Sequence, residues 1–261
     1  MSVIAILCIL AIVLSITVFM VWASASIRSG VYVRAFCREK TDRKVVYLTF
    51  DDGPHPPETE RVLDVLRERG ARATFFLIGS KVSGNEAVLH RMLEDGHALG
   101  LHTYSHAGTF PLLSFDKMLA DVNEGKRAVE SVAGKKISLF RPPFGVTNPT
   151  IAKVIRTLGL QTVGWDVRSF DTMFCKSSEH SCKQSGYSCM QSGHDWYVPV
   201  VERIMKQVRP GSVILLHDRL DGASGLLALL LDSLAASGYD FTRALPNTLI
   251  SSSDSSETNL S

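Results

Sequence analysis

The chain has 261 residues, and its 28 basic and 26 acidic side chains give a formal net charge of +2. This length suffices for one large domain with a small appendage. Because the charges nearly balance and no basic stripe carries interleaved aromatic residues, the composition excludes a protein built to bind nucleic acid. The oligomeric state stays unknown at this level.

The N-terminal segment, residues 1–27, contains no charged side chain, and residues 3–25 are almost wholly apolar. That is about the length that an α-helix needs to cross a bilayer, and the segment lacks the polar face of a soluble helix. We therefore predict a transmembrane anchor or signal segment. Ala-Ser-Ala at residues 23–25 is typical of a signal-peptidase site, but the long apolar run without a basic leader favours an uncleaved anchor.

Five cysteines are present, and Cys8 lies inside the apolar segment. The spacing of the last three is not a usual zinc pattern, so a cysteine metal site is not expected. Cys37, Cys175, Cys182 and Cys189 are an even number, which permits two disulfides in three possible pairings, with reduced thiols as the alternative.

From residue 45 onward, strand-like and helix-like segments alternate over about 200 residues, which predicts an α/β fold with a mostly parallel sheet, closed as a barrel or doubly wound. The expected strands cover residues 45–50, 73–78, 98–103, 138–141, 161–165, 212–217 and 239–242. The expected helices cover residues 58–69, 86–95, 114–133, 148–158, 198–208 and 226–237.

Two stretches fall outside this alternation. Residues 174–196 are rich in Ser, Gly, Cys and His and form an insertion, whereas the tail at 243–261 ends in a Ser-rich run and is expected to be disordered. A connector at 28–44 therefore joins the N-terminal segment to one domain at 45–242.

The first expected strand, residues 45–50, is apolar without a two-residue alternation, as in a strand buried on both faces. It ends at two adjacent carboxylates, Asp51 and Asp52, followed by Gly and Pro. Desolvation makes unpartnered carboxylates costly at such a place, so positively charged partners are expected nearby. An isolated DDGP would more simply be a turn, but other strand ends supply such partners.

The third expected strand runs into His102 and His106. Their spacing of four places two imidazoles on one side of a helical turn, which lets a single segment chelate one metal ion. Together with Asp52 they give three protein ligands and leave a position for water, as in catalytic metal sites. Zn²⁺ is the expected ion, although these ligands also suit other first-row divalent ions. Two surface histidines are the alternative for the isolated pair.

Five motifs stand at the ends of expected strands: TFDDGP, HTYSH, RPPFG, WDVRSFDT and LLHD. In this order and at these intervals they resemble the five motifs of the NodB-type polysaccharide deacetylases, carbohydrate esterase family 4, over residues 45–241. The resemblance implies a distorted (β/α) barrel and metal-dependent removal of acetyl groups from N-acetylated sugars. The three metal ligands inferred above match those of the family.

The resemblance also implies catalytic roles at matching positions. Asp51 is the general base and Arg141 braces it, while His217 is the general acid and Asp171 tunes that histidine. Taken singly, two of these residues also allow a purely structural role. Arg141 could be a surface cation in a turn. His217 could be a hydrogen-bonded core histidine, with Asp218 after it only a turn residue.

A substrate groove is expected at Tyr104, Pro143, Phe144 and Trp165. A backbone N–H near Tyr104 would help to stabilise the oxyanion. Trp165 and Phe144 could equally be core residues.

Two positions depart from the family pattern. Thr172 stands where many members carry a Trp, which puts one groove wall in doubt, and Arg168 stands where an acid is common. The insertion follows directly and is placed to cap or extend the groove.

We expect N-deacetylation of an N-acetylglucosamine-type glycan, peptidoglycan or chitin-like, with an O-acetyl xylan esterase as the alternative and a non-catalytic sugar-binding descendant as a weaker one. The N-terminal helix would hold the enzyme at the membrane, within reach of an envelope glycan. Two arguments give opposite orientations for the helix. Basic residues after the helix favour a cytoplasmic domain by the positive-inside rule, whereas an envelope glycan as substrate and four cysteines that can pair favour the exterior.

Overall fold

The structure is a computed structural model that describes residues 2–173 and 196–249. The predicted insertion, except its last residue, Trp196, lies outside the described residues. Cys175, Cys182 and Cys189 lie there as well, so their pairing stays a prediction. Within the described part of the chain, Cys8 and Cys37 form no disulfide.

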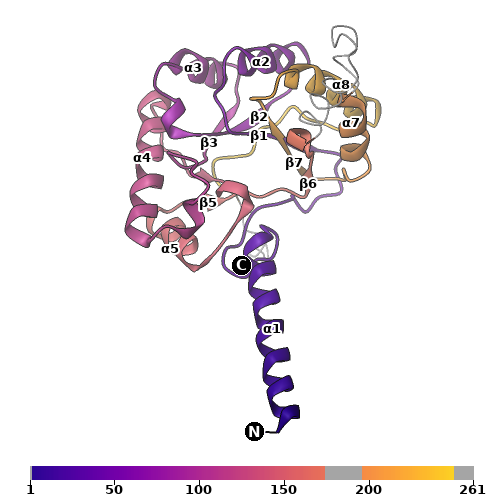
Figure 1. Cartoon of the computed structure of the whole chain (residues 1–261). Coiled ribbons are helices and arrows are strands. Elements are labelled where there is room, and N and C mark those ends of the chain that lie inside the picture. Colours follow the sequence, from indigo (N-terminus) through magenta and orange to yellow (C-terminus); the bar gives the residue numbers. More distant parts are fainter. Residues whose placement is uncertain (1, 174–195, 250–261) are drawn as a thin grey trace, which may run out of the picture.

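Among the described residues, seven parallel strands form one curled sheet in the order β5-β4-β3-β2-β1-β7-β6, and helices lie around its outside (Figure 1). This half-barrel confirms the expected distorted (β/α) barrel. The strands are β1 Val46–Asp51, β2 Ala73–Leu77, β3 Ala98–Leu101, β4 Leu139–Phe140, β5 Gln161–Thr162, β6 Val167–Arg168 and β7 Ser212–His217. The helices are α1 Val3–Ala25, α2 Glu58–Glu68, α3 Glu86–Glu94, α4 Phe115–Ala133, α5 Pro149–Leu158, α7 Tyr197–Met205 and α8 Ala223–Ala236, with short 3-10 helices η1 Gly79–Lys81, η2 Phe110–Leu112 and η3 Pro143–Gly145.

β1 is the central strand and is buried along its whole length. It lies between β2 and β7. Leu48 and Phe50 pack in the main core, whereas Tyr47 packs in the second cluster inside the half-barrel. Both faces of the strand are therefore covered, which explains why its apolar residues do not alternate with polar ones. The rings of Phe50 and Phe75 stack 5.1 Å apart in the core between sheet and helices. Truncating such a buried Phe to Ala costs about 3–5 kcal/mol.

The parallel register brings the residues that end or follow the strands to one edge of the sheet. Asp51, the last residue of β1, pairs with His217, the last residue of β7. β3 and β4 pair through their last residues, directly before His102 and Arg141. Motifs far apart in the sequence therefore meet at the carboxyl edge, where ligand sites of parallel α/β folds form.

Two strand predictions need correction. The sequence pattern does not indicate β6, because a strand of two residues is too short to show a period. The expected strand at 239–242 is wrong: only Asp240 forms an isolated bridge, with Val45. The Asp240 carboxylate accepts hydrogen bonds from the backbone and hydroxyl of Thr242 at 2.8 and 2.7 Å, so a local turn takes the place of continued strand pairing.

The expectation of a disordered tail is wrong for residues 243–249. Leu245 is buried among side chains from the inner face of the sheet, and its N–H donates to the hydroxyl of Thr74 at 3.0 Å. The N–H of Leu249 donates to the side-chain oxygen of Gln161. A single leucine that fills the inside of the half-barrel leaves no periodic signal in the sequence. Residues 250–261 lie outside the described residues.

The connector closes the open side of the half-barrel. Phe36 bridges Val163 beside β5, and Arg38 bridges Ser212 in β7. The N–H of Glu39 donates to the carbonyl of Gly211 at 2.9 Å. Residues 36–39 therefore belong to the folded domain rather than to a free linker.

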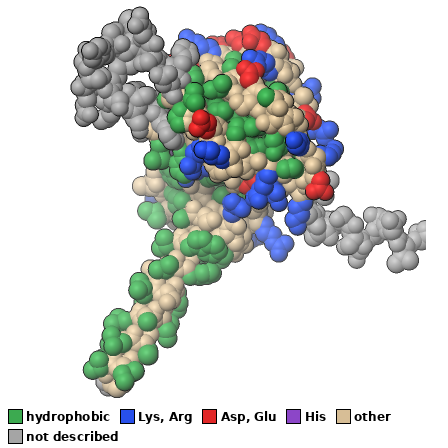
Figure 2. Space-filling view, turned by 90° about the vertical axis from the view of Figure 1, so that its right-hand side faces the viewer, with side chains coloured by type: hydrophobic (Ala, Val, Ile, Leu, Met, Phe, Trp, Pro, Cys, Tyr) green, Lys and Arg blue, Asp and Glu red, His purple; other side chains and the backbone are tan. Residues whose placement is uncertain are grey.

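α1 extends away from the domain (Figure 1), its visible face is largely apolar (Figure 2), and its sequence contains no charged residue. By length and composition it is apolar enough to cross a membrane, a test that a signal sequence near the N-terminus also passes. Its last turn contacts the domain, because the carbonyl of Ser24 accepts a hydrogen bond from the N–H of Thr147 at 2.9 Å and Ala23 is fully buried.

Candidate active site

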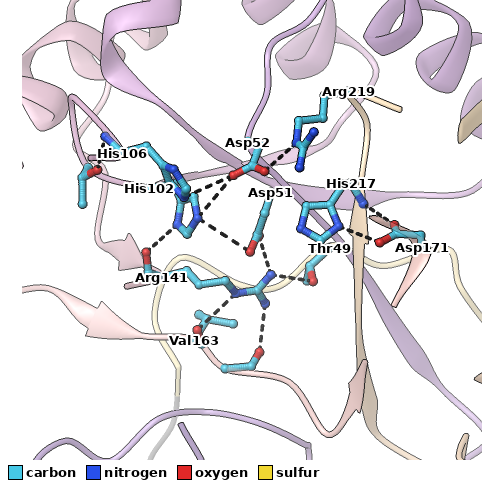
Figure 3. Close-up of polar contacts among 12 residues, drawn as sticks. Thr49, Asp51, Asp52, His102, His106, Arg141, Val163, Asp171, His217 and Arg219 are labelled. Carbon is cyan, nitrogen blue, oxygen red and sulfur yellow. Dashed lines mark hydrogen bonds and ion pairs between the residues drawn. The ribbon is translucent and has the colours of Figure 1, made fainter. Parts of the chain in front are cut away.

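The two carboxylates at the end of β1 point in different directions (Figure 3). Asp51 still belongs to the strand, whereas Asp52 has a left-handed backbone with φ 73°. Asp tolerates this conformation better than most side chains do. The change in backbone direction gives each carboxylate its own set of partners.

Asp52 and the two histidines form a cluster that could hold a metal ion. Oδ1 of Asp52 lies 3.3 Å from Nε2 of His106 and 3.7 Å from Nε2 of His102. Nδ1 of His102 lies 2.7 Å from the carbonyl oxygen of Arg141, so Nδ1 carries the proton and Nε2 offers a lone pair. One ligand atom from each residue lies within 4.8 Å of the others. This set of one carboxylate and two imidazoles fits a divalent ion.

The electrostatics of the cluster favour the ligand forms of these side chains. Burial and the neighbouring His102 lower the pKa of His106. Burial alone would raise the pKa of Asp52, but His102, His217, Arg219 and His106 lower it to about 2. A neutral imidazole and an ionised carboxylate are the states that a metal ion requires.

The two histidines do not lie on a helical turn, which corrects that expectation. They stand in the loop after β3, where Thr103 and His106 both have positive φ, 66° and 48°. The hydroxyl of Thr103 accepts a hydrogen bond from the N–H of His106 at 3.0 Å. This tight loop brings the ring centroids of His102 and His106 to 4.7 Å, so the convergence is achieved without a helix.

The backbone N–H groups near Tyr104 are not available to an oxyanion. Those of Tyr104 and Ser105 donate to the carboxylate of Asp121 in α4, at 3.0 and 3.3 Å. The next two, from His106 and Ala107, donate to side-chain hydroxyls within the loop. The expected oxyanion donor is therefore wrong at these positions. Asp121 instead fixes the loop, a role that its place inside a helical pattern does not signal.

Asp51 is held by a fully buried arginine. Nη1 of Arg141 donates to Oδ1 of Asp51 at 2.6 Å and to the hydroxyl of Thr49 at 2.9 Å. Nε and Nη2 donate to the carbonyls of Val163 and Gly164. Burial lowers the pKa of the guanidinium, while the charge of Asp51 opposes that shift. Arg141 is thus no surface cation in a turn.

His217 lies on the side of Asp51 opposite to His102, and a buried carboxylate binds it twice (Figure 3). Oδ1 of Asp171 lies 2.8 Å from Nδ1 of the ring, and Oδ2 accepts the backbone N–H of His217 at 2.9 Å. Burial alone would lower the pKa of His217, but the hydrogen bond and charge of Asp171, with the charges of Asp51 and Asp52, raise it. The imidazolium is therefore favoured, and its Nε2–H has no hydrogen-bond partner among residues 2–173 and 196–249.

Asp218 is buried and faces away from this set. It accepts the hydroxyl of Thr59 at 2.7 Å, and burial raises its pKa to about 6. A Cβ on Gly53 would lie 2.5 Å from its Oδ2, so a glycine is needed there. Asp218 packs the turn after β7 against α2.

Two basic residues hold Asp52 and were not among the expected site residues. Nε of Arg219 donates to Oδ2 of Asp52 at 2.8 Å, and Nζ of Lys81 donates to its backbone carbonyl at 2.7 Å. Arg219 lies two residues after His217, the last residue of β7, which pairs with β1. Its place directly after the LLHD motif was therefore the one signal in the sequence that it belongs to the site.

The expected groove residues differ in exposure and in what they contact. Phe144 is 52% exposed, and its ring meets that of His106 edge-on at 5.2 Å. Pro143 is buried and begins η3. Trp165 is partly buried, packed against the inner cluster of the sheet and next to the Arg141 guanidinium. Phe144 thus borders the cluster with an exposed ring, whereas Trp165 packs beside Arg141.

Comparison with known proteins gives a consistent result. Residues 38–163 match the polysaccharide deacetylase family. The peptidoglycan-N-acetylglucosamine deacetylase of Bacillus cereus is 34% identical over 207 residues, 77% of this chain and 86% of that protein. The chitooligosaccharide deacetylase of Azorhizobium caulinodans is 31% identical, covering 66% of this chain and 73% of that protein. The structure of the peptidoglycan deacetylase PdaC from Bacillus subtilis aligns with a TM-score of 0.63 at 29% identity, covering 77% and 87% of the two chains.

Proposed function

Since this chain belongs to the polysaccharide deacetylase family, carbohydrate esterase family 4, we propose that it hydrolyses N-acetyl groups of an N-acetylglucosamine-type glycan with the aid of one divalent ion. The observation that carries the proposal is the convergence at the carboxyl edge of a carboxylate paired with Arg141, a three-residue ligand cluster and a histidine paired with Asp171 (Figure 3).

Asp52, His102 and His106 would hold the ion, with Zn²⁺ as the expected species. When bound, such an ion lowers the pKa of a water molecule and polarises the acetyl carbonyl. The protein prepares the cluster by giving His102 a fixed tautomer through the carbonyl of Arg141.

Asp51 acts as general base. Its Oδ1 is held by Arg141 at 2.6 Å, and Oδ2 faces the ligand cluster, 3.9 Å from Nε2 of His102. The charge-assisted hydrogen bond from the guanidinium fixes the carboxylate, so that its other oxygen is placed to take a proton from the attacking water.

His217 acts as general acid. An amine is a poor leaving group until it is protonated, and the Nε2–H of His217 supplies that proton as the carbon–nitrogen bond breaks and acetate is released. Asp171 keeps the ring in the required tautomer and raises the pKa of the imidazolium. The same two carboxylate oxygens fix the ring and its backbone, so its orientation does not depend on the substrate.

The substrate class follows from the named relatives, which act on peptidoglycan N-acetylglucosamine and on chitooligosaccharides. The test is acetate release from N-acetylglucosamine oligomers, peptidoglycan and acetyl-xylan by the full-length protein. Activity on an N-acetyl substrate supports the proposal, and activity on acetyl-xylan alone would replace it with O-acetyl esterase activity. No release from any of them by metal-loaded protein would favour a non-catalytic descendant.

We also propose that α1 stays attached as a membrane anchor and that the domain faces the cell exterior, where such glycans lie. The close contact of Ser24 and Thr147 leaves no stalk between helix and domain. Lys and Arg side chains gather on the part of the domain beside the end of α1 (Figure 2). By the positive-inside rule this charge favours the opposite orientation, so the proposed exterior location is supported by the substrate alone. Protease accessibility in intact cells tests this: full protection of the domain would place it in the cytoplasm.

A further inference from the structure

Arg219 contacts the Asp52 carboxylate from the side opposite to the two imidazoles (Figure 3). Its Nε donates to Oδ2 at 2.8 Å, while Oδ1 lies 3.3 Å from Nε2 of His106 and 3.7 Å from Nε2 of His102. The two oxygens of one carboxylate therefore have different partners. Arg219 takes one oxygen, and the metal cluster has the other.

The fold places Arg219 firmly. β1 and β7 pair through Asp51 and His217, so the turn after β7 lies directly beside Asp52. On one side of Arg219, Asp218 is fully buried and bonded to Thr59. On its other side, Leu220 is buried and its carbonyl accepts the N–H of Ala223 at 3.0 Å. The backbone on both sides is thus held before any ligand binds.

A surface ion pair would be worth only about 0–1 kcal/mol, and the Arg219 side chain is 37% exposed. Its partner differs from a surface carboxylate, however, because the side chain of Asp52 is only 13% exposed. A carboxylate that is free to rotate can offer one or both oxygens to a cation. Hydrogen bonds to a ligand carboxylate decide which oxygen it offers, and their loss typically lowers metal affinity about 10–100-fold.

We propose that Arg219 is a positioning residue for the metal cluster: by holding Oδ2 of Asp52, it directs Oδ1 toward His102 and His106, so that Asp52 offers one oxygen to the cation. The inference rests on the proposed metal site. The positive charge of Arg219 by itself repels a divalent cation, so the sign of the effect of its removal separates positioning from repulsion.

The test compares the full-length wild type in detergent with Arg219→Ala, Arg219→Lys and a matched control, Arg209→Ala. Arg209 also directs Nε to Oδ2 of an aspartate, Asp166, at 3.4 Å, and is 49% exposed, but it does not touch the cluster. Two readouts need no substrate: Zn²⁺ affinity from competition with a chelator, and the visible spectrum of the Co²⁺-loaded protein, which reports ligand number and geometry.

We expect Arg219→Ala to bind Zn²⁺ about 10–100-fold more weakly and to change the Co²⁺ spectrum, whereas Arg209→Ala changes neither. Arg219→Lys keeps the charge but not the planar donor, so it should also bind more weakly; it decides the matter if the alanine variant does not fold. Unchanged affinity and spectrum, or a higher affinity, would overturn the inference. A wild type that binds neither ion would overturn the metal site as well, whereas acetate release by the wild type tests the proposed function separately.

Discussion

Two buried histidines flank β3, one at each end of the strand, and the two have different partners. His97 precedes the strand at the amino edge and is 4% exposed, and His102 follows it at the carboxyl edge and is 2% exposed. Nδ1 of His97 accepts the N–H of Ala73 at 3.3 Å, and its Nε2 has no partner among the described residues. Nε2 of His102 faces two carboxylates instead.

The amino edge is not devoid of charge or space. A cavity of about 510 Å³ opens there, and its basic lining residues, Arg72, Lys135 and Arg243, have no carboxylate among the lining with them. The lining therefore offers no carboxylate beside His97 to bind a cation or to act as a base, whereas the carboxyl edge has Asp51 and Asp52 beside His102. Burial of a histidine therefore does not make it functional; an accompanying set of carboxylates does.

Removing the two imidazoles at the carboxyl edge should have the largest effect. We expect the double variant His102→Ala, His106→Ala to lose bound metal and to release no measurable acetate, because only Asp52 of the three ligands remains. Metal content by elemental analysis, beside a fold check by circular dichroism, measures this. Stoichiometric metal in the double variant would show that the ion binds elsewhere.

Asp51→Asn should separate the base from the ligands. The substitution keeps the shape but removes basicity, so turnover should fall by about two to four orders of magnitude while metal content stays that of the wild type. Assays of acetate release and of bound metal on the same sample test both parts. Wild-type turnover, or loss of metal, would contradict the division of roles between Asp51 and Asp52.

Asp171→Asn should be recognised by a change in the pH dependence of activity rather than by the size of its effect on the rate. The protonated form of His217 donates the proton, so activity is lost as pH rises through its pKa. Asp171 raises that pKa, and removing its charge should shift the alkaline limb of kcat/KM to lower pH. His217→Ala, as the companion variant, should lose this limb and about two to four orders of magnitude in turnover. An alkaline limb at the wild-type position in Asp171→Asn would reject the coupling.

His97→Phe, at the amino edge, should have the smallest effect. Turnover and metal content should match the wild type, because His97 contacts neither the cluster nor the base. Burial lowers the pKa of His97 from 6.5 to about 4, so between these pH values the unfolded chain binds a proton that the folded chain does not. The wild type should therefore lose stability as pH falls through this window, and the variant should lose less. Urea unfolding at pH 7 and pH 5 measures this, and an equal loss in both proteins would contradict it.

The sequence alone determined most of the strands along the chain and the principal residues of the candidate site. A run such as β1 needs only its own composition to be recognised as a strand covered on both faces. Asp52, His102, Arg141 and His217 could be grouped before any coordinates, because parallel strands place their carboxyl ends at one edge. The rule about the carboxyl ends of parallel strands holds for any such sheet, and each motif can be read from a few neighbouring residues.

Only the tertiary structure decided what holds these residues in place. Asp121 binds the loop from 17 residues away and Arg219 binds Asp52 from 167 residues away, and such contacts depend on strand register and helix rotation. The loop of His102 and His106 likewise needs left-handed backbone at Thr103 and His106, which spacing alone misread as a helical turn. Leu245 fills the half-barrel from an apparently featureless tail, because one buried side chain in an irregular segment has no period by which to predict it.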